Sequence, residues 1–144
     1  MAAIVETLNA VKTALETAGL TVEIDRQEDE VLADAEYPLA SLSWGGAELT
    51  EETTCDSYWW KATIIVDLWF KVETGVTVLA GCDTMASTVA AAFRADRSFG
   101  GKFFHSKIVA LSDLGTIAAD VGALTVTAEV MFQTAKGDWS TISS

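Results

Sequence analysis

The sequence predicts a single α+β domain in which a mainly antiparallel sheet is covered by two helices. Residues 3–18 and 78–95 space their apolar side chains three or four positions apart, as on one face of a helix. Residues 58–72 instead alternate apolar and polar side chains, as in a strand with one buried face. With shorter alternating stretches between turn residues, the expected order is α-β-β-β-α-β-β over residues 1–144, ending in a polar tail at 136–144.

The first helix is expected over residues 3–18, followed by Gly19, a residue type that often ends a helix in the left-handed conformation. Its apolar stripe consists of Ile4, Leu8, Val11 and Leu15. Residues 20–24 alternate apolar and polar side chains, which predicts a short strand. The acid-rich stretch 26–36 is expected to be a loop.

A second strand is expected over residues 39–44, directly after Pro38, the only proline of the chain. Proline lacks a backbone donor and is tolerated at the start of a strand. We expect Gly45 and Gly46 to end this strand and to open a second acidic loop, residues 45–56.

The clearest pattern is the alternation over residues 58–72. The even positions, which we expect to face the core, are Trp60, Ala62, Ile64, Val66, Leu68, Phe70 and Val72. A strand of this length extends roughly 50 Å at about 3.3 Å per residue, well beyond the usual strand length of about 17–20 Å. We therefore expect the strand to bend or to project beyond the globular body.

The second half continues with a helix over residues 78–95 and a turn over residues 96–101. A strand is expected within residues 102–111 and a loop over residues 112–121. Residues 123–134 alternate apolar and polar side chains again, which predicts the last strand.

The composition excludes several classes of function. The chain has 21 acidic and 9 basic residues and a net charge of −12, and its basic residues are scattered, so no phosphate-binding patch is expected. It has no apolar run of membrane-spanning length, and residues 1–4 lack the pattern of a secretory signal, so we expect neither a membrane span nor secretion. Two cysteines, Cys55 and Cys82, suggest reduced thiols in a cytosolic setting.

The sequence also lacks the usual patterns of catalytic and metal sites. His105 is the only histidine, and Cys55 and Cys82 lie far apart, so neither a zinc site nor another metal site is expected. The glycine pairs at 45–46 and 100–101 lack the spacing of phosphate-binding loops. We expect no enzyme and no cofactor, although a Cys–His nucleophilic pair stays open at this point.

The polar face of the long strand carries unexpected aromatic residues. Trp59 and Trp69 lie on this face, beside Ile65. They either form a partner surface or are covered by another layer of the same domain. The candidate interface residues are Trp59, Lys61, Ile65, Asp67, Trp69 and Trp139. For Trp69→Asp we expect a folded monomer that does not assemble.

Four stretches together resemble a known family. Residues 94–101, Arg-Ala-Asp-Arg-Ser-Phe-Gly-Gly, resemble the helix-to-strand turn of the tail terminators of long-tailed phages, the minor tail protein U-like proteins. The N-terminal helix leading to Asp25-Arg26, the strand at 37–42 and the strand at 123–134 are similar to that family in the same order. The resemblance covers nearly the whole chain, but its tryptophan-rich strand and acidic 45–56 loop depart from the family pattern.

The resemblance implies a structural virion protein at the head-proximal end of the tail, assembled in the host cytoplasm. Such proteins form a hexameric ring of identical subunits on the completed tail tube, stop its polymerisation and present a surface to the head connector. DNA passes through the ring as cargo, without specific binding, and no membrane is involved. We expect the acidic loops to line this lumen, through Glu28, Asp29, Glu30, Glu48, Glu51 and Glu52.

Two alternatives remain at the level of sequence. One is another neck or head-completion protein of the same virion. The other, from a different class, is a small α+β ligand-binding domain, which predicts a concave pocket with convergent polar groups.

Overall fold

A computed structural model describes residues 3–24, 37–50, 57–72, 75–96, 98–99, 101, 103–112, 115–118 and 121–135. Its elements are α1 (Ala3–Thr17), β1 (Val22–Ile24), β2 (Leu39–Leu49), β3 (Ser57–Lys71), α2 (Val78–Ala95), β4 (His105–Leu111), β5 (Gly115–Ala118) and β6 (Val121–Ala135). The predicted α+β class and the predicted order of elements are confirmed, with the short strand β5 as an addition.

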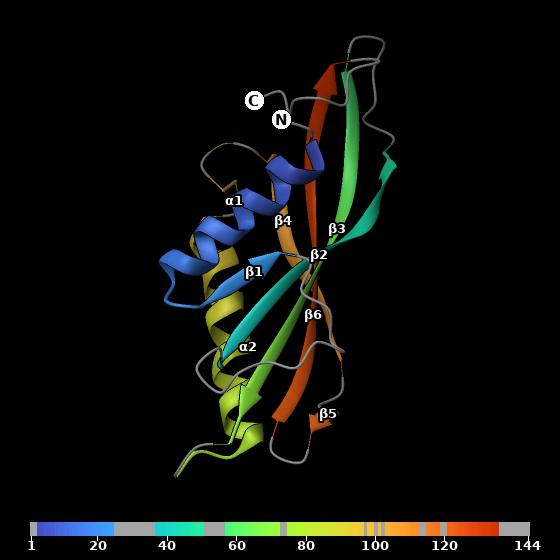
Figure 1. The fold of residues 1–144 in the computed structure, drawn as a ribbon. Coiled ribbons are helices and arrows are strands. Elements are labelled where there is room, and N and C mark those ends of the chain that lie inside the picture. Colours follow the sequence, from blue (N-terminus) through green and yellow to red (C-terminus); the bar gives the residue numbers. More distant parts are fainter. Residues whose placement is uncertain are drawn as a thin grey trace.

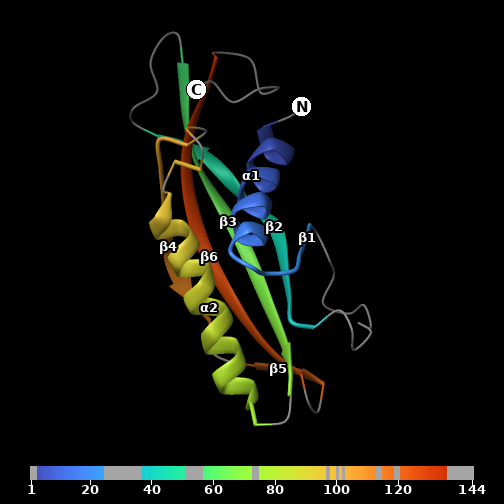
Figure 2. The same ribbon diagram turned by 90° about the vertical axis from the view of Figure 1, so that its left-hand side faces the viewer.

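The sheet has the strand order β1-β2-β3-β6-β4, and β5 pairs with one end of β6. All described pairings are antiparallel except that of β1 with β2. β3 and β6 pair along their whole length, from Ser57 opposite Ala135 to Lys71 opposite Val121. They form the long curved centre of the molecule in Figure 1. Figure 2 shows both helices on one face of the sheet, which leaves the other face without a helix.

The core lies between the helices and the sheet. The even positions of β3 face it as predicted, since Ala62, Ile64, Val66 and Leu68 are all 0% exposed. The prediction is wrong for Val72, which follows the last residue of β3 and is 47% exposed. The helices contribute buried residues at helical spacing, among them Val11, Leu15, Val89 and Phe93. Burial of these apolar surfaces is the main force that holds the two layers together.

Close contact between α2 and the sheet depends on two glycines. An added Cβ at Gly81 of α2 would lie 2.3 Å from the ring of Phe70 in β3. An added Cβ at Gly122 of β6 would lie 2.0 Å from Val78, the first residue of α2. A side chain at either position would therefore push the helix away from the sheet.

The prediction that Gly45 and Gly46 end the second strand is wrong. β2 continues through them to Leu49, with a register shift between Trp44 and Ala47 that marks a bulge. Gly46 has a φ of +102°, which favours glycine, so the pair accommodates a bend rather than an end. Figure 1 shows the second half of β2 turning away from the first half.

The prediction of a loop over residues 112–121 is wrong for part of that stretch. Gly115–Ala118 form β5, which pairs with the start of β6. β6 itself begins at Val121, two residues earlier than predicted, and both differences come from this pairing. Four residues are too few to show a clear alternation of apolar and polar side chains. The strand conformation of β5 depends on its pairing with β6.

Candidate protein interface

The potential metal ligands and the reactive side chains of the described residues lie apart from one another. No group of three or more potential metal ligands occurs among them, and none of their helices is long and apolar enough to cross a membrane. Cys82 is 1% exposed in the core, where burial raises the pKa of its thiol and keeps it protonated. His105 is paired with Met131, on the face of the sheet without helices. Cys82 and His105 therefore lie on opposite faces of the sheet and do not form a nucleophilic pair, and Cys55 lies outside the described residues.

The helix-free side of the sheet, called here the open face, carries the odd positions of β3 and their neighbours. Two ion pairs cross its strands: Lys61 Nζ lies 3.6 Å from Glu48 Oε1, and Lys107 Nζ lies 3.9 Å from Glu129 Oε1. Both pairs are partly exposed and long, so each adds little to stability.

Trp59 and Lys61 lie on the open face, as predicted for the odd positions of the long strand. The Trp59 ring packs edge-to-face on Phe104, with centroids 5.3 Å apart and an angle of 84° between the rings. Phe104 is 72% exposed, so this aromatic pair is part of the surface. Ile65 is half-buried on the same face, between Ser43 of β2 and Thr127 of β6.

The expectation that Trp69 belongs to a partner surface is wrong. The residue is 2% exposed and forms a small second core with Leu39, against which Tyr37 and Ala123 pack. For this tryptophan the other interpretation holds, namely that the domain itself covers it. Its burial also changes what Trp69→Asp is expected to do: a buried carboxylate would replace a core side chain, so we now expect the variant to be destabilised rather than folded and unassembled.

Asp67 is also engaged within the chain. The Thr125 hydroxyl donates a hydrogen bond of 2.7 Å to Asp67 Oδ1. Thr125 in turn is paired with Ser112, whose hydroxyl accepts from the Thr125 backbone N–H at 2.8 Å. Asp67 thus helps to join β3 to β6, and its carboxylate is held within the sheet.

The expectation that Glu48 lies in a loop is wrong. The residue lies in β2 opposite Lys61, to which it is ion-paired. The cause is the bulge at the two glycines, which extends the strand past the expected end. The other residues of the predicted interface and lumen lie outside the described residues: Glu28, Asp29, Glu30, Glu51, Glu52 and Trp139.

Sequence reasoning missed the exposed apolar residues at the sheet edges. Phe104 directly precedes β4 and is 72% exposed, and Leu111, the last residue of β4, is 60% exposed. Val109 of β4 and Leu49 of β2 are also exposed. The run Ile108-Val109-Ala110-Leu111 has no polar alternation, and this signal could have indicated an edge strand that is apolar on both faces.

The turn after α2, where the resemblance is centred, has a structural role. Asp96 Oδ1 accepts hydrogen bonds from the Ser98 backbone N–H at 3.1 Å and the Ser98 hydroxyl at 2.8 Å. The Phe99 ring is buried between Phe93 and Phe103, with centroid distances of 5.0 and 5.4 Å. Asp96 therefore fixes the turn through its hydrogen bonds to Ser98, and Phe99 packs the end of α2 against Phe103, just before β4.

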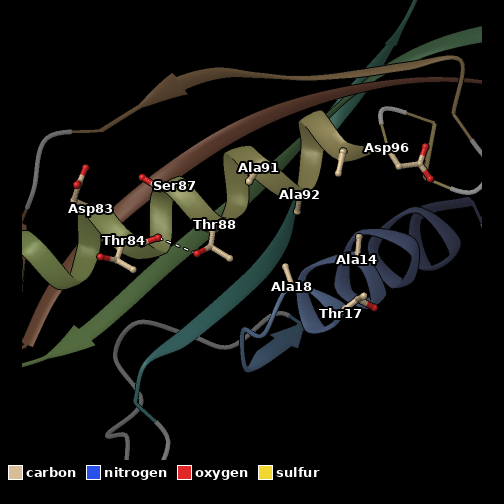
Figure 3. A pocket seen from close by; sticks show the side chains of 11 residues that line it. Ala14, Thr17, Ala18, Asp83, Thr84, Ser87, Thr88, Ala91, Ala92 and Asp96 are labelled. Carbon is tan, nitrogen blue, oxygen red and sulfur yellow. Dashed lines mark hydrogen bonds between the residues drawn. The ribbon is translucent and has the colours of Figure 1, made fainter.

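A groove of about 780 Å³ lies between α1 and α2 on the helical side. Its lining is mostly small residues, seen in Figure 3. The hydroxyls of Thr84 and Thr88 donate to backbone carbonyls of their own helix, each at 3.0 Å, and Thr17 does the same at 2.9 Å. These three hydroxyls donate within their own helices, and Asp83, Ser87 and Asp96 also line the groove.

No family model and no curated protein matches the chain. One solved structure, whose name gives no function, is similar at 14% identity with a TM-score of 0.43. That match covers 89% of this chain and 91% of the other. A likeness of this degree carries no argument about what the chain does.

Proposed function

We propose that the chain is a phage tail terminator, a non-enzymatic virion protein that forms a ring on the completed tail tube. The ring, a hexamer by family resemblance, stops tube polymerisation and provides the surface that the head connector or a head-completion protein binds. Its place is the head-proximal end of the tail in the virion, after assembly in the host cytoplasm.

The observation that carries the proposal is the distribution of apolar surface on the sheet. The helices lie on one face, and the exposed apolar side chains include Leu49, Phe104 and Leu111 at the strand edges. Apolar surface at the edges of a single subunit is favourably buried by neighbouring subunits. The ordered motif resemblance adds a specific kind of assembly to this general expectation.

The charge of the chain supports the passage of DNA. A net charge of −12 repels phosphates and disfavours stalled contacts in a lumen. DNA is therefore a passing cargo in this proposal, without a specific binding site.

The test is the growth of tail tubes from purified tube protein of the same virion, followed by electron microscopy. Addition of the chain should stop growth at an amount far below one chain per tube subunit, because one ring caps one tube. The matched control is the Trp69→Asp chain, whose core is disrupted and which should not cap. Unchanged tube lengths with the folded chain would contradict the proposal.

A further inference from the structure

The sheet ends in two different strand edges. β4 is its last strand on one side, with no described strand beyond it. On the other side β1 pairs with β2 only at residues 40–42, so no described strand lies beside residues 45–49 of β2. Figure 1 shows β4 and this half of β2 on opposite sides of β3 and β6. Edge strands direct backbone N–H and C=O groups outward, where another chain can pair with them.

The two edges carry opposite charges on the open face. The Glu48 side chain on β2 is 73% exposed, and the Lys107 side chain on β4 is 55% exposed. The strand registers place Glu48 level with His105 and one row away from Lys107. The acid of one edge and the base of the other therefore lie at nearly the same height along the sheet.

The directions of the strands also match. Three antiparallel pairings separate β2 from β4, so the two strands run in opposite directions. A second copy in the same orientation would therefore bring its β2 alongside β4 as an antiparallel neighbour. The exposed Leu49 of one edge and the exposed Phe104 at the start of the other, which the registers place at the same height, would lie at this junction.

We infer that the β4 edge of one copy pairs antiparallel with residues 45–49 of β2 in the next copy, extending the sheet from subunit to subunit. This inference rests on the proposed function for its partner, a second copy of the chain. Glu48 of one copy then faces Lys107 and His105 of the other. Backbone hydrogen bonds and apolar contacts hold the junction, and the charges select which edges meet.

Charge also decides between a ring and a two-fold dimer. Pairing of two β4 edges would bring two copies of Lys107 to the same face, and pairing of two β2 edges would do the same for Glu48. Contact between two different edges on opposite sides of a subunit is heterologous, and such contacts build rings when the rotation closes. The edge charges therefore favour the ring.

The test is disulfide cross-linking of the purified chain in a Cys55→Ser background. Chains with Glu48→Cys are mixed with chains with His105→Cys, the position level with Glu48, and oxidised. The expected product has twice the 15.3 kDa mass of one chain and joins one chain of each kind. A chain with both substitutions should give a ladder of multiples. The control pairs His105→Cys with Glu16→Cys, an exposed position of α1, and should stay monomeric.

Absence of the mixed product, or equally strong cross-linking of either single variant with itself, would overturn the edge pairing. The tube-growth experiment separates this failure from that of the proposed function. A ladder without any effect on tube growth supports the edge pairing and contradicts the terminator. Capped tubes without a ladder contradict the edge pairing and leave the terminator standing.

Discussion

Trp69 packs against Leu39, Tyr37 and Ala123 on the open face of the sheet, and only 2% of it is exposed. A large side chain enclosed in this way contributes mainly through the apolar surface that it removes from water. Trp59 differs from Trp69 because its ring packs against Phe104, a side chain that is itself exposed at the surface.

Replacement of Trp69 should therefore affect folding rather than assembly. Loss of a buried tryptophan costs about 3–5 kcal/mol, and an unpaired buried carboxylate adds to this, so Trp69→Asp should lower the free energy of unfolding by at least about 3 kcal/mol. Urea denaturation measures this change. Trp59→Ala is the control, with an expected loss of about 1 kcal/mol. Equal losses for the two variants would show that Trp69 is not a core residue.

The odd positions of β3 show what a sequence can predict at the residue scale. Alternation correctly separates the core-facing side of the strand from the other side, because the side chains of a strand point to opposite faces. It does not tell whether Trp69 on the second side meets water, since Leu39 and Tyr37, which pack with it, lie some thirty residues away along the chain.

At the scale of elements, α2 and β3 approach each other where Gly81 faces Phe70. Thr77 caps the start of this helix by accepting a hydrogen bond of 3.1 Å from the Ala80 backbone N–H. The helix is thus held at its N-terminus by a cap and along its buried side by close contact.

Gly81→Ala should destabilise the protein although alanine is the better helix former. The propensity gain is about 0.5–1 kcal/mol, but forcing a methyl group into the Phe70 ring costs about 1–3 kcal/mol, so a net loss of roughly 1 kcal/mol is expected. Thermal unfolding measures it. Ser87→Ala, at an exposed position of the same helix, should be neutral or slightly stabilising. A gain in stability for Gly81→Ala would contradict the close contact.

Both helices were predictable to within a residue or so, because apolar spacing extends over several turns. The end of β2 was not, because a glycine pair is compatible with a turn and with a bulge, and only the pairing with β3 distinguishes them. The same holds for β5, whose four residues owe their strand conformation to β6.

For the molecule as a whole, the sequence predicted the α+β class and a mainly antiparallel sheet covered by two helices, but not that both helices lie on the same face. The candidate surface was predictable only in part. Trp59 and Lys61 lie on the open face as expected, whereas the edge residues Phe104 and Leu111 emerged only from the position of β4 at the end of the sheet. Which strand lies at the edge depends on the order of all strands in the sheet, so a local sequence pattern does not predict it directly.

The central claim is that this chain ends the growth of a tail tube. The most direct measurement is the length distribution of tails, by negative-stain electron microscopy, in a virus that lacks the chain. Without the chain, the tubes should be abnormally long and variable, and normal lengths should return when the chain is supplied. Tails of normal length that lack heads would contradict it and would indicate a head-completion protein instead.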